Sequence, residues 1–173
     1  PLTLALTGAT GFVGQRTLDR ALAAGHRVRA LTRRPQPPRD GVTWISGSLN
    51  DRRALEALCE GAEAAIHIAG VINAPDAAGF EAGNVTGTAN LLAAAKSAGV
   101  ERFVHVSSLA AREPQLSLYG ASKARSETLV RTSGLDAAIV RPPAVYGPGD
   151  RETLELFKMA KLGVMALPPE GRL

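Results

Sequence analysis

A tyrosine and a lysine stand four residues apart in the run from Tyr119 to Lys123. In a helix this spacing places both side chains on one face, and a nearby ammonium favours the phenolate form of a phenol. Ser107 and Ser108 end an apolar run, where a hydroxyl could hydrogen-bond a substrate carbonyl. Together these groups could protonate and stabilise the oxyanion that hydride transfer creates. Each feature also has an ordinary explanation, because Y-x-x-x-K occurs by chance in helices and serines at strand ends often bond loops.

Three glycines near the start have the spacing G-x-x-G-x-x-G, after an apolar run and before a helical pattern. Such a turn lets backbone approach a pyrophosphate, and the helix N-terminus supplies unpaired N–H donors for phosphate. The alternative is a purely structural strand-to-helix turn. The residues of this turn expected to bind a dinucleotide are Gly8, Thr10, Gly11, Phe12, Val13 and Gly14.

The second predicted strand ends at Thr32 and is followed by Arg33 and Arg34, with no acidic residue before Asp40. NAD-binding versions of the turn usually have an acid there for the ribose 2′-hydroxyl, whereas guanidinium groups bind a 2′-phosphate. We therefore expect NADP, with NAD as the alternative cofactor. Both arginines could instead be surface charges of a loop.

Apolar strands and helical segments alternate along the chain. We expect strands at residues 2–7, 27–32, 42–46, 64–69, 102–107 and 137–140, and helices at 12–24, 51–59, 80–98, 119–132 and 151–162. Three prolines make 33–41 a loop, and a polar loop with Pro114 precedes Tyr119. This order predicts an α/β fold, a doubly wound parallel sheet of the Rossmann type with three αβα layers. Ligands then bind at the carboxyl ends of the strands.

Composition excludes several other classes of protein. The chain has 173 residues, a net charge of +4 and a single cysteine, Cys59, so an internal disulfide and a cysteine metal site are not expected. Its basic residues are scattered, which argues against nucleic-acid binding. The apolar start is interpreted as a strand and not as a signal peptide, and no apolar run reaches about 20 residues. We expect a cytoplasmic protein with no metal and no membrane partner.

Several motifs resemble the short-chain dehydrogenase/reductase superfamily, in its extended or atypical branch, over nearly the whole chain. Within that branch the chain looks most similar to complex-I-accessory-like NAD(P)-binding proteins. The motifs are Thr7–Gly14, Asn84–Thr88, Phe103–Ser108 and Arg141–Gly149.

The resemblance implies roles for individual residues. Tyr119 would be the general acid/base, Lys123 its partner and Ser108 the hydroxyl that polarises the carbonyl, while Asn84 would support the lysine through water unless it only begins a helix. Pro142 to Val145 would line the nicotinamide. The full implied cofactor set beyond the glycine turn and the arginines is Ser48, Leu49, Ala69, Gly70, Val71, Ser107, Tyr119, Lys123, Pro142 and Val145.

The chain also departs from this branch. Ser48 stands where an acid often contacts adenine, so we expect backbone and Leu49 to hold the base. Extended members continue beyond a segment like Leu167–Gly171 into a substrate lobe. We therefore expect a dinucleotide-binding domain at 1–163, and at 164–173 either the start of a truncated substrate lobe or an irregular tail, in a fragment of a longer protein.

Two functions follow. The first is an NADP-dependent oxidoreductase acting on a carbonyl or alcohol of a small molecule, a sugar nucleotide among the options, with Tyr119 as proton relay. The second is a non-catalytic NAD(P)-binding module that regulates or assembles a complex. The 80–98 helix and the tyrosine helix could form a homodimer, although the former would pack equally well on its own sheet.

Overall fold

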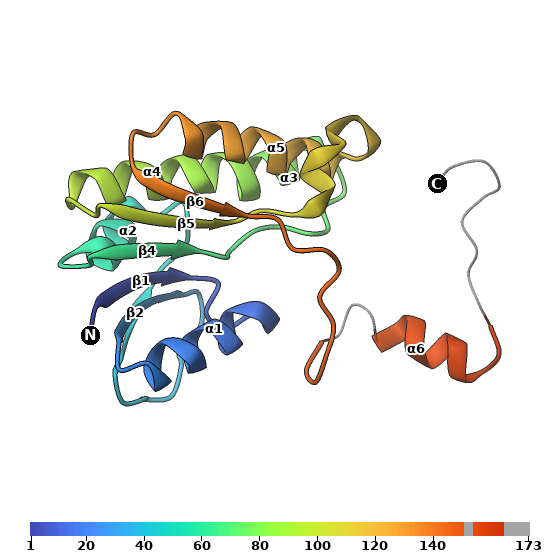
Figure 1. Ribbon diagram of the computed structural model, residues 1–173, viewed down its shortest axis with the longest axis horizontal. Coiled ribbons are helices and arrows are strands. Elements are labelled where there is room, and N and C mark those ends of the chain that lie inside the picture. Colours follow the sequence, from blue (N-terminus) through green and yellow to red (C-terminus); the bar gives the residue numbers. More distant parts are fainter. Residues whose placement is uncertain (151–153, 165–173) are drawn as a thin grey trace. The chain divides into compact units, whose positions relative to one another are not determined.

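The computed structural model describes residues 1–150 and 154–164. Six parallel strands form one sheet in the order β3-β2-β1-β4-β5-β6 (Figure 1). Their bounds are β1 Thr3–Thr7, β2 Arg27–Thr32, β3 Val42–Ser46, β4 Ala64–His67, β5 Arg102–Val106 and β6 Asp136–Val140. The strand order reverses beside β1, which is the place where doubly wound sheets bind nucleotides.

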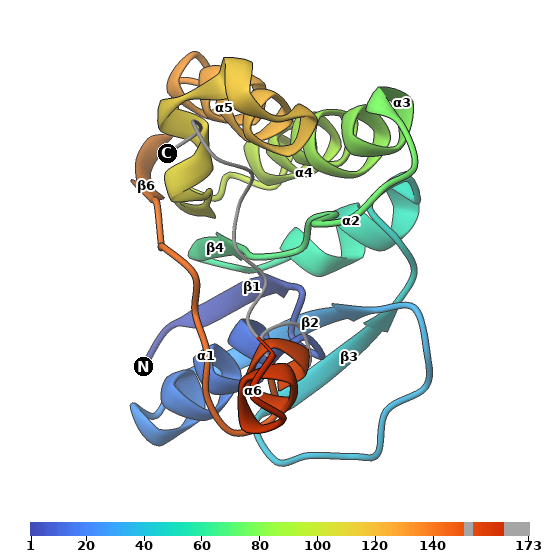
Figure 2. The ribbon, with the colours of Figure 1, turned by 90° about the vertical axis from the view of Figure 1, so that its right-hand side faces the viewer.

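Helices cover both faces of this sheet. Helix α1 (Phe12–Ala23) lies on one face, whereas α2 (Arg52–Cys59), α4 (Gly87–Ser97) and α5 (Leu118–Arg131) lie on the other (Figures 1 and 2). The connection from β2 to β3 has no helix, as its prolines predicted. The expected three-layer Rossmann fold is therefore confirmed.

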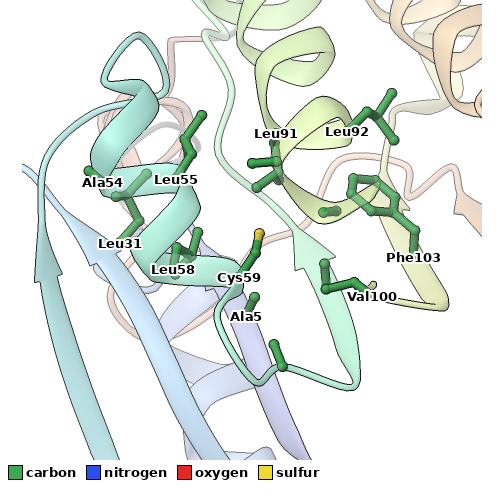
Figure 3. Packing of buried hydrophobic residues seen from close by; sticks show 14 of the residues in the cluster. Ala5, Leu31, Ala54, Leu55, Leu58, Cys59, Leu91, Leu92, Val100 and Phe103 are labelled. Atoms are coloured by element: carbon green, nitrogen blue, oxygen red, sulfur yellow. The ribbon is translucent and has the colours of Figure 1, made fainter. Parts of the chain in front are cut away.

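Two apolar clusters hold the layers together. The cluster under α1 includes Leu6, Leu18 and Val28, whereas the cluster on the opposite face gathers residues from α2, α4 and the central strands. Figure 3 shows that second cluster around Leu55, Leu58 and Phe103. Cys59 is fully buried within it, and burial raises the pKa of its thiol to about 11 while Arg29 opposes that rise. Cys59 is thus a small residue of the core.

The expected helix over 80–98 differs from the one observed. A short helix α3 (Ala77–Phe80) leads into a π-helical segment η1 (Glu81–Thr86), and α4 begins only at Gly87. A π segment adds a residue to the helical turn, and such insertions are frequent at functional sites. Asn84 lies inside η1, so neither a regular helix nor a helix start describes it.

Smaller differences concern the ends of elements. Strand β4 ends at His67 and not at residue 69, and the Ala69 N–H donates to the Thr7 hydroxyl instead of to a strand carbonyl. The loop before Tyr119 contains two short 3₁₀ turns, η2 (Leu109–Arg112) and η3 (Pro114–Leu116). Ser117 accepts a hydrogen bond from the Gly120 N–H and so starts α5 one residue before Tyr119.

The chain divides into a first unit, Pro1–Pro143, and a second that begins at Ala144. The sheet and its helices belong to the first unit, and α6 (Leu154–Lys161) belongs to the second. Residues 151–153, where the last expected helix begins, and 165–173, which include the expected irregular tail, lie outside the described residues. Within 1–150 and 154–164, every helix is too short or too polar to traverse a bilayer.

Candidate cofactor and active site

The glycine turn joins β1 directly to α1. Gly8 has a φ of +76°, and the Gly11 N–H donates to the Gly8 carbonyl at 3.0 Å. A Cβ on Gly14 would collide with that same carbonyl oxygen, so the turn closes only with glycine there. Gly11 caps α1 without a side-chain hydrogen bond, which leaves the first helical N–H groups directed at the turn. The residues present therefore fit a pyrophosphate.

The two arginines after β2 are both exposed. Thr32 fixes the backbone beneath them by donating its hydroxyl to the Arg34 carbonyl at 2.7 Å. Within the part of the chain that the structure describes, neither guanidinium donates to a protein group. Their charges are thus available to an anion beyond the end of β2.

The segment after β3 lies against the start of α4. The Leu49 side chain fills the space that a Cβ on Gly87 would need, and the Asn90 amide donates to the Leu49 carbonyl at 2.9 Å. Ser48 accepts a hydrogen bond from the Asn50 N–H at 3.3 Å. Ser48 and Leu49 are therefore held at the carboxyl edge of β3, where the resemblance places the adenine.

A buried hydrogen-bond chain links the glycine turn to η1. Thr88 donates its hydroxyl to the Asn84 carbonyl at 2.7 Å, so the 3.0 Å bond between His67 Nε2 and Thr88 is donated by the imidazole. His67 Nδ1 then accepts from the Thr7 hydroxyl at 2.7 Å, and that hydroxyl accepts from the Ala69 N–H at 3.2 Å. Burial lowers the pKa of His67 well below 6.5, with the nearby His105 and Lys123 adding to the lowering, so His67 is neutral.

Asn84 is 2% exposed and connects the segment after β4 to α5, the helix that contains Tyr119. Its Oδ1 accepts from the Val71 N–H at 2.7 Å, and its Nδ2 donates to the Val71 carbonyl at 2.8 Å and to Ser122 Oγ at 2.9 Å. Ser122 in turn donates to the Tyr119 carbonyl at 2.7 Å. A Cβ on Gly70 would lie 2.9 Å from Asn84 Oδ1 and 3.8 Å from Lys123 Nζ. Gly70 therefore lies beside both Asn84 and the lysine, Val71 is bonded to Asn84, and Ala69 lies against Gly8 of the glycine turn.

Lys123 is buried, with 4% of its surface exposed, and its Nζ donates to the Val106 carbonyl at 2.8 Å. Burial lowers the pKa of Lys123 to about 8, and the charge of Glu127 opposes that lowering. Tyr119 is half-buried on the same helix face, with its ring 6.2 Å from that of Phe80. The structure thus places the lysine at the end of β5, on the helix that also contains the tyrosine.

The two serines after β5 differ in their bonds. Ser107 is buried and donates its hydroxyl to Glu127 Oε1 at 2.6 Å, so that proton is already used. Ser108 is half-buried and only accepts a bond, from the Ala110 N–H at 3.2 Å, at the start of η2. Within residues 1–150 and 154–164 the Ser108 hydroxyl donates to no protein group, and its role at a carbonyl stays a prediction.

The remaining predicted residues lie near β6 or beyond it. The Pro142 carbonyl accepts from the Leu109 N–H at 2.9 Å, so this segment runs beside the Ser108 turn. Val145 belongs to the second unit, and its place at the nicotinamide stays a prediction.

Sequence reasoning missed the residues that support this site. Glu127 pairs with Arg141 through two hydrogen bonds, at 2.8 and 2.6 Å. The available signal was the spacing of four residues between Lys123 and Glu127, which places both on one helix face. His67 and Thr7 gave no such signal, because single polar residues at strand ends are common. No three metal-binding side chains gather within residues 1–150 and 154–164.

A family model described as the NAD dependent epimerase/dehydratase family matches residues 4–162. The ceramide reductase of Caulobacter vibrioides is 53% identical over 162 residues, which cover 91% of this chain and 50% of that protein. The sterol demethylase protein B of Methylococcus capsulatus is 36% identical over 175 residues, which cover 86% of this chain and 53% of that protein. The chain spans about half the length of these relatives.

Among solved structures, a short-chain dehydrogenase/reductase superfamily protein from Agrobacterium tumefaciens with bound NAD matches with a TM-score of 0.71 and 31% identity. The match covers 80% of this chain and 48% of that one. The likeness therefore extends over most of the sheet and its helices.

Proposed function

Because the chain belongs to the NAD dependent epimerase/dehydratase family, we propose that it is the cofactor-binding part of an NADP-dependent reductase of the short-chain dehydrogenase/reductase type. The observation that supports this most is Lys123, a buried ammonium at the carboxyl end of the sheet that shares a helix face with Tyr119. A buried lysine is costly unless its donors are used. The Val106 carbonyl takes one donor, and ribose hydroxyls would take others.

Three residues of the chain, Ser108, Tyr119 and Lys123, act on the substrate carbonyl in different ways. The nicotinamide, when bound, supplies the hydride. Ser108 donates its hydroxyl to the carbonyl oxygen, where negative charge develops as the carbonyl carbon gains hydride. Tyr119 donates its phenolic proton to that oxygen, which yields the alcohol and a phenolate. Lys123 stabilises the phenolate until solvent returns the proton. Oxidation of an alcohol is the reverse.

We further propose a substrate with an apolar, lipid-like body. Three leucines flank Ser108 and Tyr119 and are exposed, namely Leu109 at 44%, Leu116 at 77% and Leu118 at 52%. Clustered exposed apolar side chains often belong to a binding surface. The names of two relatives, ceramide reductase and sterol demethylase protein B, refer to lipids. A sugar nucleotide is the competing substrate class.

Tyr119→Phe in the natural full-length protein tests the catalytic role. Removing the phenolic proton should lower kcat by about 10²- to 10⁴-fold. Cofactor affinity, measured by calorimetry, should stay within about twofold, because Ser122 and the backbone of α5 are unchanged. Turnover that survives the substitution would contradict the role of Tyr119, and failure to bind either NADP or NAD would contradict the proposed function as a whole.

A substrate panel tests the lipid-like class. Ketones with long acyl chains and UDP-sugars would be offered with NADPH to the same protein and to a Leu116→Ser variant. We expect reduction of the long-chain ketones, with KM raised by the serine. A preference for UDP-sugars would overturn the apolar assignment and leave the reductase chemistry intact.

A further inference from the structure

Glu127 lies on α5 four residues after Lys123 and eight after Tyr119, so the three side chains share one side of the helix. It is 2% exposed, although it is an acidic residue outside the predicted catalytic set. A buried carboxylate is stable only when its oxygens are paired or hydrogen-bonded. Its partners therefore indicate why an acid stands there.

Each of the two carboxylate oxygens of Glu127 accepts two hydrogen bonds. Oε1 accepts from the Ser107 hydroxyl at 2.6 Å and from Arg141 Nε at 2.8 Å. Oε2 accepts from the second Arg141 donor at 2.6 Å and from Arg131 at 2.9 Å. The Arg141 contact is bidentate, the geometry that fixes direction as well as distance.

These partners come from the ends of two neighbouring strands. Ser107 directly precedes Ser108 at the end of β5, and Arg141 directly precedes Pro142 at the end of β6. The backbone reinforces the pairing, because the Ser107 N–H donates to the Val140 carbonyl at 2.7 Å. One carboxylate thus connects the serine segment, the tyrosine–lysine helix and the Pro142 segment.

The charges around this carboxylate favour its ionised form. Burial alone would raise the pKa of Glu127, but hydrogen bonds from Arg141 and Ser107, and the charge of Arg141, outweigh burial and lower it to about 2. Glu127 is therefore an anion at neutral pH. Its charge also opposes the lowering of the Lys123 pKa that burial causes.

We propose that Glu127 is a positioning residue for the reaction, whose carboxylate fixes Ser108, the Tyr119–Lys123 helix and Pro142 relative to one another. The proposal rests on the proposed function, because it concerns the same site. Glu127 acts through Ser107, Arg141 and Lys123. A neutral amide has one acceptor oxygen and no net charge, so glutamine cannot reproduce its four bonds.

The proposal has a consequence for proton exchange at Lys123. The groups that interact with this ammonium are Glu127 on its own helix, His67 on β4, His105 on β5 and the Val106 carbonyl. The pKa values of both histidines are far below neutrality, so both imidazoles are uncharged at neutral pH. Among these partners of Lys123, Glu127 then carries the charge. Without that charge, Lys123 should lose its proton at a lower pH.

The experiment compares three variants of the natural full-length protein, Glu127→Gln, Glu127→Asp and Glu81→Gln. Glu81 is the matched control, because it also pairs with an arginine of α5, Arg125, but at an exposed site. Lys123 is titrated without cofactor by NMR of protein labelled at the lysine ε-carbon, with Lys123→Arg to assign its signal. kcat, the cofactor KM and their pH profiles are measured in parallel.

We expect Glu127→Gln to lower the pKa of Lys123 by about one unit from about 8, and to move the high-pH limb of kcat in the same direction. kcat should fall by about 10- to 100-fold through misplacement of the reacting groups. Glu127→Asp should keep the pKa while losing part of kcat, and Glu81→Gln should change neither. An unchanged Lys123 titration and pH profile, with only reduced stability, would overturn the proposal.

If Glu127→Gln does not fold, Arg141→Lys provides a second test. Lysine keeps a positive charge but cannot form the bidentate contact. We expect the Lys123 titration to persist and kcat to fall, and an unchanged kcat would overturn the proposal. The titration needs neither cofactor nor turnover, so this inference can fail while cofactor binding and Tyr119-dependent turnover still stand.

Discussion

Asn84 and Val71 exchange two hydrogen bonds, from the Val71 N–H to Asn84 Oδ1 at 2.7 Å and from Asn84 Nδ2 to the Val71 carbonyl at 2.8 Å. The Asn84 amide thus pairs with both backbone polar groups of Val71, as a neighbouring strand would, although the chain at Val71 has already left the sheet. Its third bond, to Ser122, attaches the same segment to α5. The path of the chain after β4 therefore depends on one buried amide.

Asn84→Ala should lower the free energy of unfolding by about 2–4 kcal/mol, because it leaves both polar groups of Val71 without their partner. Asn50→Ala, at an exposed position, should cost less than about 0.5 kcal/mol. Urea unfolding of each variant measures the difference. Equal losses for the two variants would show that the Val71 contacts contribute little.

Gly14 and Gly11 should respond differently to alanine. A Cβ at Gly14 would collide with the Gly8 carbonyl, so Gly14→Ala should destabilise the fold by about 3 kcal/mol. A Cβ at Gly11 would meet that oxygen only at 3.3 Å, so Gly11→Ala should fold and instead weaken cofactor binding. Thermal unfolding and calorimetric titration with NADP separate these effects. A Gly14→Ala protein as stable as its parent would contradict the steric argument.

Stability should fall as the solution becomes mildly acidic. Burial lowers the pKa of His105 to about 3, with the charge of Lys123 adding to the lowering and that of Glu127 opposing it. Burial also lowers the pKa of His67. Between 6.5 and about 4.5 the unfolded chain binds protons that the folded chain does not, so folding stability decreases as pH falls. Each histidine contributes up to about 1.4 kcal/mol per pH unit.

Chemical unfolding at a series of pH values measures this slope. Replacing His105 by glutamine should remove about half of it, because His67 remains. Glu127 also contributes at the acid end of this window, because its pKa is about 2 in the folded chain and 4.5 when unfolded, so the slope from pH 6.5 to about 5.5 reports the imidazoles. A stability that is flat from pH 6.5 to 4.5 would show that the imidazoles are not buried and neutral.

Arg33 and Arg34 should decide between the two cofactors. Replacing both with alanine should reduce affinity for NADP by at least about tenfold, since charge-assisted hydrogen bonds contribute about 1.5–3 kcal/mol each. Affinity for NAD should change little. Arg53→Ala on α2, also an exposed arginine, is the control and should alter neither affinity. Equal losses for NADP and NAD would mean that the arginines do not contact a 2′-phosphate.

The sequence predicted the layers of the fold because each boundary had a local cause. Gly25, Gly99 and Gly134 end helices with positive φ values, and the prolines of 33–41 prevent a helix there. The π segment had no such cause. Its residue Asn84 bonds Val71, which belongs to a different segment, and no local sequence pattern indicates that these two residues meet.

For the candidate site, the sequence indicated some residues but not the bonds that each of them makes. Tyr119 and Lys123 were found because their spacing has a chemical use, and the structure places the lysine beside Gly70 and Asn84. Ser107 was expected to serve the cofactor, yet its hydroxyl is bound to Glu127. A residue's type shows what it is able to bond, whereas the choice among partners depends on packing between distant segments.

The π segment η1 also changes the phase of the helix that contains it. One additional residue rotates everything before it by about 100° relative to a regular α-helix of 3.6 residues per turn. Asn84 bonds Val71 and Ser122 from inside this segment, whereas Leu91 and Ala95 farther along pack in the core cluster. Deleting a single residue from η1 would restore regular winding and rotate Phe80, which directly precedes η1, by about 100° relative to α4. The buried Phe80 ring would then turn away from Tyr119.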